Sequence, residues 1–373
     1  MISSWLHGLL IFVPVGIWAF LSDRAPLIVF VTNGIAIVPL SSLLTGATEK
    51  IAEDAGDGIG ALLNITLGNL VELILFVALR HNRLHVVQAS ILGSMFVNLL
   101  PILGVALCVN GTSHDDPVLN LAETQLLSCL LVVSTFVLLI PAALNFTLDE
   151  STKEGGARLR MSRASALVVL AIYICYIIYE IRAHVPPTPS ISPLSQTADI
   201  ERYPASLSPR VSVGLEREVH RRSKSEKALS VLLLMISSVL MSMCAEFLVG
   251  TIDEITRQGH LSESFIGLVL LPIVGNVAEF VTVVTVAHRE KMDLAIAVAV
   301  GSAVQIALCV TPLTIIASWV MARDLTLSFS LFDAAALIGA TVLANFFLGD
   351  ASSVSRVSKL KGALMCACYA IIG

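Results

Sequence analysis

The chain has 373 residues, of which 56% are hydrophobic and 14% charged, and its formal net charge is −5. Soluble proteins carry about 25% charged residues, so the composition excludes a soluble enzyme, a nucleic-acid-binding protein and a disordered chain. We expect an all-α integral membrane protein, because a run of about 20 apolar residues forms one membrane-spanning helix.

The apolar runs predict ten membrane-spanning helices in chain order, with an eleventh beginning near Leu360. Only 14 residues remain from Leu360 to Gly373. At about 1.5 Å per residue they cannot cross a hydrocarbon core of about 30 Å, so we expect the last helix to be incomplete. The ten predicted spans are residues 5–21, 26–45, 58–79, 86–109, 121–144, 164–181, 228–249, 264–287, 293–320 and 325–348.

A proline- and serine-rich segment, residues 183–227, ends in a charged run and has the composition of a flexible linker. It divides the chain into residues 1–25 as a leading helix, 26–182 as a first repeat and 228–373 as a second. Lysine and arginine counts in the short loops give conflicting answers for the two halves, so the positive-inside rule does not decide the membrane orientation.

The two halves contain the same pair of motifs. Gly68-Asn69-Leu70-Val71-Glu72 precedes Gly93-Ser94, and Gly275-Asn276-Val277-Ala278-Glu279 precedes Gly301-Ser302. The offset in sequence from Asn69 to Asn276 equals that from Glu72 to Glu279, and the offset from Gly93 to Gly301 is greater by one. With five spans in each half, the second repeat is inverted relative to the first. Inverted-topology five-helix repeats are typical of transporters with a binding site near the bilayer midplane.

Two acids fall in the middle of predicted spans, where a charge costs about 2.5–3.5 kcal/mol. Glu72 and Glu279 therefore require a partner, a proton or a cation. Asn69 and Asn276 lie three residues earlier, on the same helix faces. Carboxylate and amide oxygens suit a hard divalent cation such as Ca²⁺ or Mn²⁺. Helix packing is the alternative role for buried amides, but the repetition of the motif favours a cation site.

Further oxygen-bearing side chains lie in the spans that follow each glutamate. The candidate supporting ligands are Gln88, Ser94, Asn98, Ser302 and Gln305. Two more acids, Glu49 and Glu246, lie near the ends of the preceding spans. We interpret them as a second-tier cation or proton relay, with placement at the membrane interface as the alternative.

These motifs resemble those of the cation/proton exchanger family of vacuolar Ca²⁺/H⁺ antiporters, particularly its fungal and plant members. The resemblance is carried by Gly46 to Glu49, Asn64 to Glu72, Val86 to Ser94, Phe265 to Glu279 and Lys291 to Leu308. It implies eleven helices, a vacuolar membrane location and a central pair, Glu72 and Glu279, surrounded by the amide and hydroxyl side chains named above. It also implies that Glu49 and Glu246 both lie along the cytosolic path.

The chain departs from the family pattern at several positions. Phe280 stands where the family has a histidine, and Val97 where a serine is usual. The segment 183–227 has more basic than acidic residues, whereas the family's segment between the repeats is typically an acidic helix. These departures, with the short C-terminus, also suggest a truncated, non-transporting relative.

Charge balance predicts a mechanism. Two buried carboxylates are tolerated when one Ca²⁺ or two protons neutralise them, so the transporter is expected to exchange Ca²⁺ for H⁺ and to load an acidic compartment. Na⁺/Ca²⁺ exchange on a related fold is the alternative. An intramembrane hydrolase is disfavoured, because the histidines fall in predicted loops. The expected partners are Ca²⁺, H⁺ and the lipid bilayer, with no resident cofactor and no nucleic acid.

Overall fold

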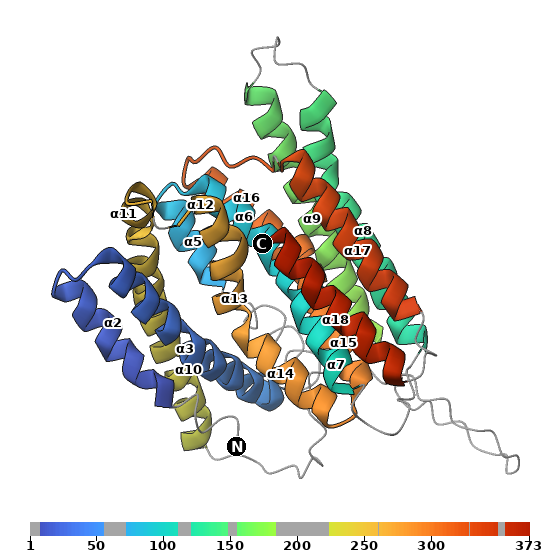
Figure 1. Ribbon diagram of the computed structural model, residues 1–373, viewed down its shortest axis with the longest axis horizontal. Helices are drawn as coiled ribbons and strands as arrows, with labels where there is room; N and C mark the ends of the chain where they lie inside the picture. The colour runs from blue at the N-terminus through green and yellow to red at the C-terminus, as the bar shows by residue number, and fades with distance from the viewer. Residues whose placement is uncertain are drawn as a thin grey trace, which may run out of the picture.

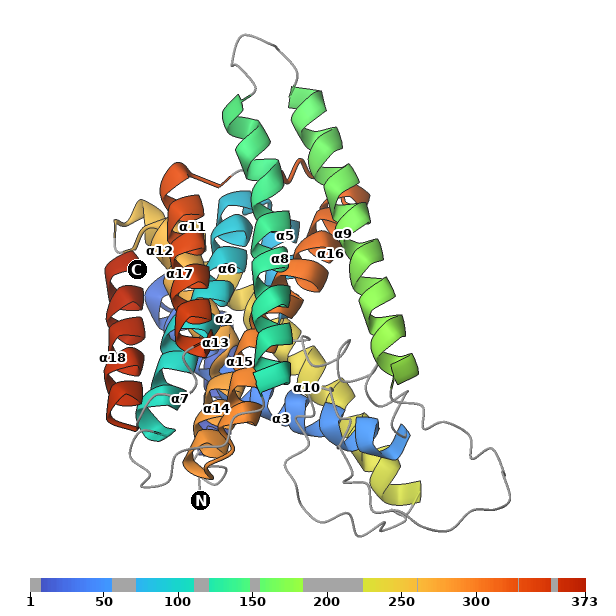
Figure 2. The same cartoon turned by 90° about the vertical axis from the view of Figure 1, so that its right-hand side faces the viewer.

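The computed structural model describes residues 8–55, 72–110, 121–147, 155–183, 224–259, 261–327, 329–349 and 355–373. The regular structure of these residues is helical throughout (Figure 1). Most helices pack side by side, whereas α3 and α10 run obliquely to α8, α17 and α18 (Figure 2). Of the expected linker 183–227, residues 184–223 lie outside the described part of the chain.

The first half of the chain forms a leading helix and then the helices of the first repeat. The predicted span 58–79 is described only from Glu72 onward. The elements are η1 (Leu9–Ile11), α2 (Phe12–Leu21), α3 (Pro26–Ala55), α5 (Leu73–Arg80), α6 (Leu84–Val97), η3 (Asn98–Ile102), α7 (Leu103–Asn110), α8 (Leu121–Thr147) and α9 (Gly155–Ala183).

The second half repeats this series after the linker. Its elements are α10 (Lys224–Gly250), α11 (Ile252–Arg257), α12 (Glu263–Phe265), η4 (Ile266–Leu270), α13 (Leu271–Gly275), α14 (Val277–His288), α15 (Met292–Gln305), η5 (Ile306–Val310), α16 (Thr311–Val320), α17 (Leu331–Gly349) and α18 (Ser355–Ile372).

The internal repeat extends to the backbone. The segments α6–η3 and α15–η5 have equal lengths. Leu84 precedes Met292, and Ile102 precedes Val310, by the same number of residues as Gly93 precedes Gly301. In the turn that precedes each segment, one non-glycine residue has a left-handed conformation, Asn82 with φ 59° and Glu290 with φ 62°. These two residues share the same offset, so the same turn is built twice from different side chains.

Three π-helical turns, η3, η4 and η5, interrupt the inner helices, and each is associated with a proline. Pro101 lies inside η3, whereas Pro272 and Pro312 follow shortly after η4 and η5. Proline has no N–H group and its ring clashes with the carbonyl four residues earlier. A wider turn relieves that clash while keeping the helix continuous.

The described residues contain seven helices long and apolar enough to cross a membrane, or eight if the bent pair around Asn276 counts as one span. The predicted start of the tenth span at residue 325 is wrong, because α17 begins at Leu331. Leu325, Leu327 and Phe329 are buried in the non-helical segment before it. An apolar pattern alone does not distinguish such a segment from a helix.

The last helix also differs from the expectation. It begins at Ser355 rather than near Leu360, and its 18 residues extend about 27 Å. Basic residues in its first turns lower the hydropathy there and hide the true start. The helix packs tightly on α7, since a Cβ added to Gly362 would overlap the carbonyl oxygen of Gly104.

Candidate cation site

The second-repeat glutamate lies just after a break in its helix. The bent pair of segments Glu263–Gly275 and Val277–His288 makes an angle of 52°. Asn276 stands between them with φ −98° and ψ 16°, and its carbonyl accepts the first hydrogen bond of α14 from Phe280 N. Glu279 is therefore in the first turn of a half-helix, where unpaired N–H groups favour a negative charge.

The first-repeat glutamate has an equivalent place. Glu72 is the N-cap residue of α5, so both glutamates stand at the N-terminal ends of short helices. Both glutamates are half-buried in the helix bundle, Glu279 Oε2 is shielded from solvent, and the two carboxyl groups interact electrostatically. Two neighbouring buried carboxylates repel one another unless a cation or protons neutralise them.

An amide bridge joins the two repeats beside Glu279. Asn98 Nδ2 donates to Asn276 Oδ1 over 2.8 Å and to the carbonyl oxygen of Ser94 over 2.9 Å. Asn276 Nδ2 in turn donates to the carbonyl oxygen of Pro272 over 2.8 Å. Both asparagines are buried. The break in the second repeat is thus held by a side chain of the first repeat.

Several buried oxygen atoms in this region have no hydrogen-bond partner among the described residues. They include Glu279 Oε2, Asn98 Oδ1 and Ser90 Oγ. Ser90 was not among the sequence-predicted residues, although its spacing of four from Ser94 places Ser90, Ser94 and Asn98 on one helix face. An unpaired buried acceptor is costly, and oxygen atoms of this kind are ligands for a hard cation.

Two glycines, one from each repeat, allow α6 to approach the broken helix. A Cβ on Gly93 would overlap the carbonyl oxygen of Leu268 and lie 2.5 Å from Pro272 Cγ. A Cβ on Gly267 would lie 2.8 Å from Ala89 Cβ. Glycine is required for this contact, which brings the polar face of α6 to the break at Asn276.

The other predicted ligands have mixed placements. Asn69 lies outside the described residues. Gln88 donates its amide to the backbone carbonyl of Thr326 in the segment before α17, at the beginning of α6 and away from Asn98. Its role as a supporting ligand stays a prediction. Ser302 and Gln305 lie one turn apart on α15, and their role as ligands stays a prediction.

The two acids expected on one path lie toward opposite ends of the molecule. The helices α3 and α10 are antiparallel, because Lys227 Nζ pairs with Asp54 Oδ1 at 3.8 Å while Gly34 faces Leu248. Glu49 and Glu246 are both near the C-terminal ends of their helices. A shared cytosolic path for both acids does not fit this arrangement.

Glu246 belongs to a cluster of ion pairs that joins the repeats. It pairs with His81 Nε2 at 3.0 Å and with Arg80 at 3.5 Å. Arg83, in the same turn before α6, contacts Asp253 and lies 3.4 Å from Glu263. Basic side chains around one turn of the first repeat are thus bound by acids of the second.

Three features define a secondary transporter for cations: inverted repeats, short helices that begin at glutamates inside the bundle, and buried oxygens without partners among the described residues. A family model agrees: the one described as sodium/calcium exchanger protein matches residues 25–182 and 229–372. The chain belongs to this family.

Its relatives include a vacuolar calcium ion transporter of Schizosaccharomyces pombe, 35% identical over all of this chain and 84% of the relative. A Ca²⁺/H⁺ antiporter of Aphanothece halophytica is 31% identical, over all of this chain and 95% of the relative. A vacuolar cation/proton exchanger of rice is 30% identical over 99% of this chain and 85% of its own length. The resemblance to cation/proton exchangers is confirmed.

A solved structure of native YfkE superposes with a TM-score of 0.78 at 25% identity, covering 98% of each chain. The crystal structure of the H⁺/Ca²⁺ exchanger CAX gives a TM-score of 0.63 at 15% identity, over 99% of this chain and 93% of that one. The second match, with its lower identity, supports only the assignment of the fold. Together they confirm the predicted all-helical, inverted-repeat class.

Proposed function

We propose that this transporter is a Ca²⁺/H⁺ antiporter that moves cytosolic Ca²⁺ into an acidic compartment by alternating access. The observation that carries the proposal is the neighbouring pair Glu72 and Glu279 in the bundle core, beside buried oxygens that lack partners among the described residues. The names of the relatives, vacuolar calcium ion transporter and Ca²⁺/H⁺ antiporter, support the choice of ions.

Mutual exclusion at the glutamate pair is the proposed mechanism. One Ca²⁺ neutralises both carboxylates, and so do two protons. The empty, doubly ionised pair is the state of highest energy in a low dielectric. The protein therefore changes its access only when it carries one load or the other, and each Ca²⁺ is exchanged for at least two H⁺.

The surrounding side chains have supporting roles in this proposal. Asn69 and Asn276 supply amide oxygens next to the glutamates, and Ser94, Asn98, Ser302 and Gln305 supply further oxygens from α6, η3 and α15. Asn276 is engaged through Nδ2 and Oδ1 at the same time, so a bound cation shares its carbonyl with Asn98. Asn98 Oδ1, which has no hydrogen-bond partner among the described residues, is the freer ligand.

The decisive experiment is ⁴⁵Ca²⁺ uptake into proteoliposomes driven by a proton gradient, acid inside. The wild-type protein should accumulate Ca²⁺, and Glu72→Gln and Glu279→Gln should each abolish accumulation. Glu254→Gln is the matched control, because Glu254 is an exposed acid on α11. Uptake by either core variant at the wild-type rate would refute the glutamate-pair mechanism.

Na⁺/Ca²⁺ exchange is the second candidate, since the family model is that of sodium/calcium exchangers. The same vesicles distinguish the two reactions when the proton gradient is collapsed and a sodium gradient is imposed. Uptake that persists on sodium alone identifies Na⁺ as the counter-ion. Absence of uptake on either gradient would favour a non-transporting relative.

A vacuolar membrane location is part of the proposal, supported by the fungal relatives. Fractionation of cells that produce the chain should recover it with a vacuolar membrane marker. Recovery with plasma-membrane markers would overturn this location while leaving the ion-exchange chemistry unaffected.

A further inference from the structure

The turn between α5 and α6 joins the two repeats at one end of the bundle. At this end α5, α6, α11 and α12 come together (Figure 1). Arg83 of the turn contacts Asp253 on α11 and lies 3.4 Å from Glu263 on α12. The Arg83 side chain is 19% exposed, so these ion pairs lie partly within the bundle. A movement of α6 away from the second repeat has to break both of them.

Next to these ion pairs, α6 packs closely on the broken helix of the second repeat. A Cβ added to Gly267 would lie 2.8 Å from Ala89 Cβ and 3.0 Å from the carbonyl oxygen of Val86. Val86 and Ile266 are both fully buried. An apolar contact therefore closes this end of the bundle beneath the ion pairs.

Ser90 is a polar residue enclosed by this contact. It is 2% exposed, and its Oγ has no hydrogen-bond partner among the described residues. Other buried serines on helices, such as Ser134 and Ser318, donate to the carbonyl oxygen three residues earlier. Ser90 departs from this usual pairing, and a buried polar group without a partner calls for an explanation.

The position of Ser90 points to an ion path rather than to the cation site itself. Ser90 lies two turns before Asn98, about 12 Å along the helix axis, so one ion cannot contact both side chains. It lies two turns after Arg83. Because Ser90, Ser94 and Asn98 share one face of α6, their oxygen atoms form a row from the candidate site toward the Arg83 ion pairs.

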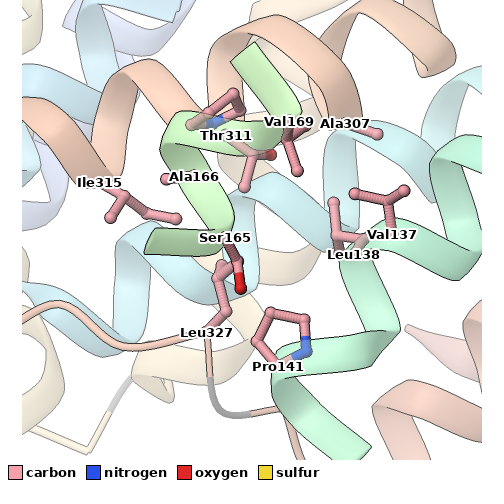
Figure 3. Close-up of a pocket in the computed structure, with 11 residues that line it drawn as sticks. Val137, Leu138, Pro141, Ser165, Ala166, Val169, Ala307, Thr311, Ile315 and Leu327 are labelled. Atoms are coloured by element: carbon pink, nitrogen blue, oxygen red, sulfur yellow. The ribbon is translucent and has the colours of Figure 1, made fainter. Parts of the chain in front are cut away.

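The cavity drawn in Figure 3 has a different lining. It lies among α8, α9, η5 and α16, and most of its lining side chains are apolar, including Leu138, Val169 and Ile315. The Thr311 hydroxyl in the lining already donates to the carbonyl oxygen of Ile306 over 2.8 Å. Such a surface stabilises a cation poorly, so the row of oxygens on α6 is the better path.

We propose that Ser90 lines the ion path to the end of the bundle where α6 begins, and that the Arg83 ion pairs keep this path closed in the present structure. This inference rests on the proposed function, because alternating access requires one end to be closed while the other is open. When the closed end opens, α6 parts from the second repeat and the Ser90 hydroxyl becomes a ligand for the passing cation. The second repeat has Val298 at the equivalent position, so the row of oxygens is not repeated there.

Ser90→Ala tests the path by ⁴⁵Ca²⁺ uptake. Removal of one oxygen contact should lower the maximal rate by about two- to tenfold. The melting temperature without cation should stay at the wild-type value or rise, because the substitution removes an unpaired buried hydroxyl. Ser134→Ala is the matched control, since it removes a paired hydroxyl on α8 and should leave the uptake rate unchanged. A wild-type rate for Ser90→Ala would overturn the path.

Single cysteines test the closure without transport. All seven native cysteines are replaced by alanine, and Ser90→Cys is treated with a membrane-impermeant maleimide on the side from which Glu254→Cys is labelled. Glu254 is exposed on α11, next to the Arg83 contact. Arg83→Met should raise the labelling rate of Ser90→Cys at least about tenfold, and Arg80→Met less than about fivefold. Ser134→Cys should stay protected in every background.

The outcomes separate this inference from the proposed function. Equal labelling rates of Ser90→Cys with and without Arg83→Met would overturn the closure by Arg83. Faster labelling with Arg83→Met, in a protein whose wild type exchanges no Ca²⁺ for H⁺, would support the closed path and refute the proposed function alone.

Discussion

Asn98 of the first repeat donates its side-chain amide to the side-chain carbonyl of Asn276 in the second, over 2.8 Å. This hydrogen bond lies at the break between α13 and α14, three residues before Glu279. It couples the position of a candidate ligand helix to the geometry of the half-helix that carries the glutamate. A movement of one repeat relative to the other therefore has to stretch or break it.

Substitution of Asn98 by alanine should weaken both stability and cation binding. It removes the amide donor and leaves Asn276 Oδ1 buried without its partner, at a cost of about 1–3 kcal/mol. We expect a lower melting temperature in detergent and a higher Ca²⁺ KM. The matched control is Asn345→Ala, because the Asn345 amide donates to Thr341 on its own helix and should affect KM little. A wild-type KM for Asn98→Ala would contradict this role.

Two glycine-to-alanine substitutions should have opposite effects on stability. Gly93→Ala places a methyl group against the carbonyl oxygen of Leu268, so α6 and η4 must separate, which costs about 1–3 kcal/mol. Gly339, on α17, has no neighbouring atom within 4 Å of an added Cβ, so alanine there should add up to about 1 kcal/mol. Melting temperatures measured side by side should fall for the first variant and rise for the second.

The Arg83 cluster should contribute more to stability than the neighbouring Arg80 pair. The Arg83 side chain is 19% exposed and faces two acids of the second repeat, whereas that of Arg80 is 70% exposed. Arg83→Met should cost about 1.5–3 kcal/mol, and Arg80→Met less than about 1 kcal/mol. Thermal unfolding at low and high salt measures the stability of both variants. Equal losses of stability would show that the Arg83 ion pairs contribute no more than the Arg80 pair.

Single cysteines at Glu49 and Glu246 should be labelled from opposite sides of the membrane. The antiparallel packing of α3 and α10 places these residues toward opposite ends of the bundle. The experiment uses sealed vesicles of uniform orientation, a membrane-impermeant maleimide and a background in which all seven cysteines are alanine. Labelling of both positions from the same side would contradict the arrangement of these two helices.

Much of the architecture could be predicted because it depends on composition and on exact repetition. Apolar runs locate most spans, and the spacing of Glu72 and Glu279 identifies the two repeats. The predicted span 86–109 agrees with α6–η3–α7 to within two residues at either end. Long apolar segments give strong signals because burial in lipid leaves few alternatives to a helix.

The unpredicted features depend on contacts between distant residues. The pairing of Glu246 with His81, and the turn of Gln88 toward Thr326, arise only when helices far apart in sequence meet. The π-helical turns are local, but proline alone does not specify them, because Pro39 and Pro141 lie inside ordinary α-helices.

Helix α9 packs on η5 and α16 of the second repeat, and α18 packs on η3 and α7 of the first, which has a consequence for assembly. Neither half of the chain contains the helix that covers its own η3 or η5, so a half produced alone would leave that turn and the flanking glycine or proline facing lipid. Two halves made as separate polypeptides should therefore form a native bundle only when they are co-expressed as complementary fragments. Each half expressed alone should be degraded.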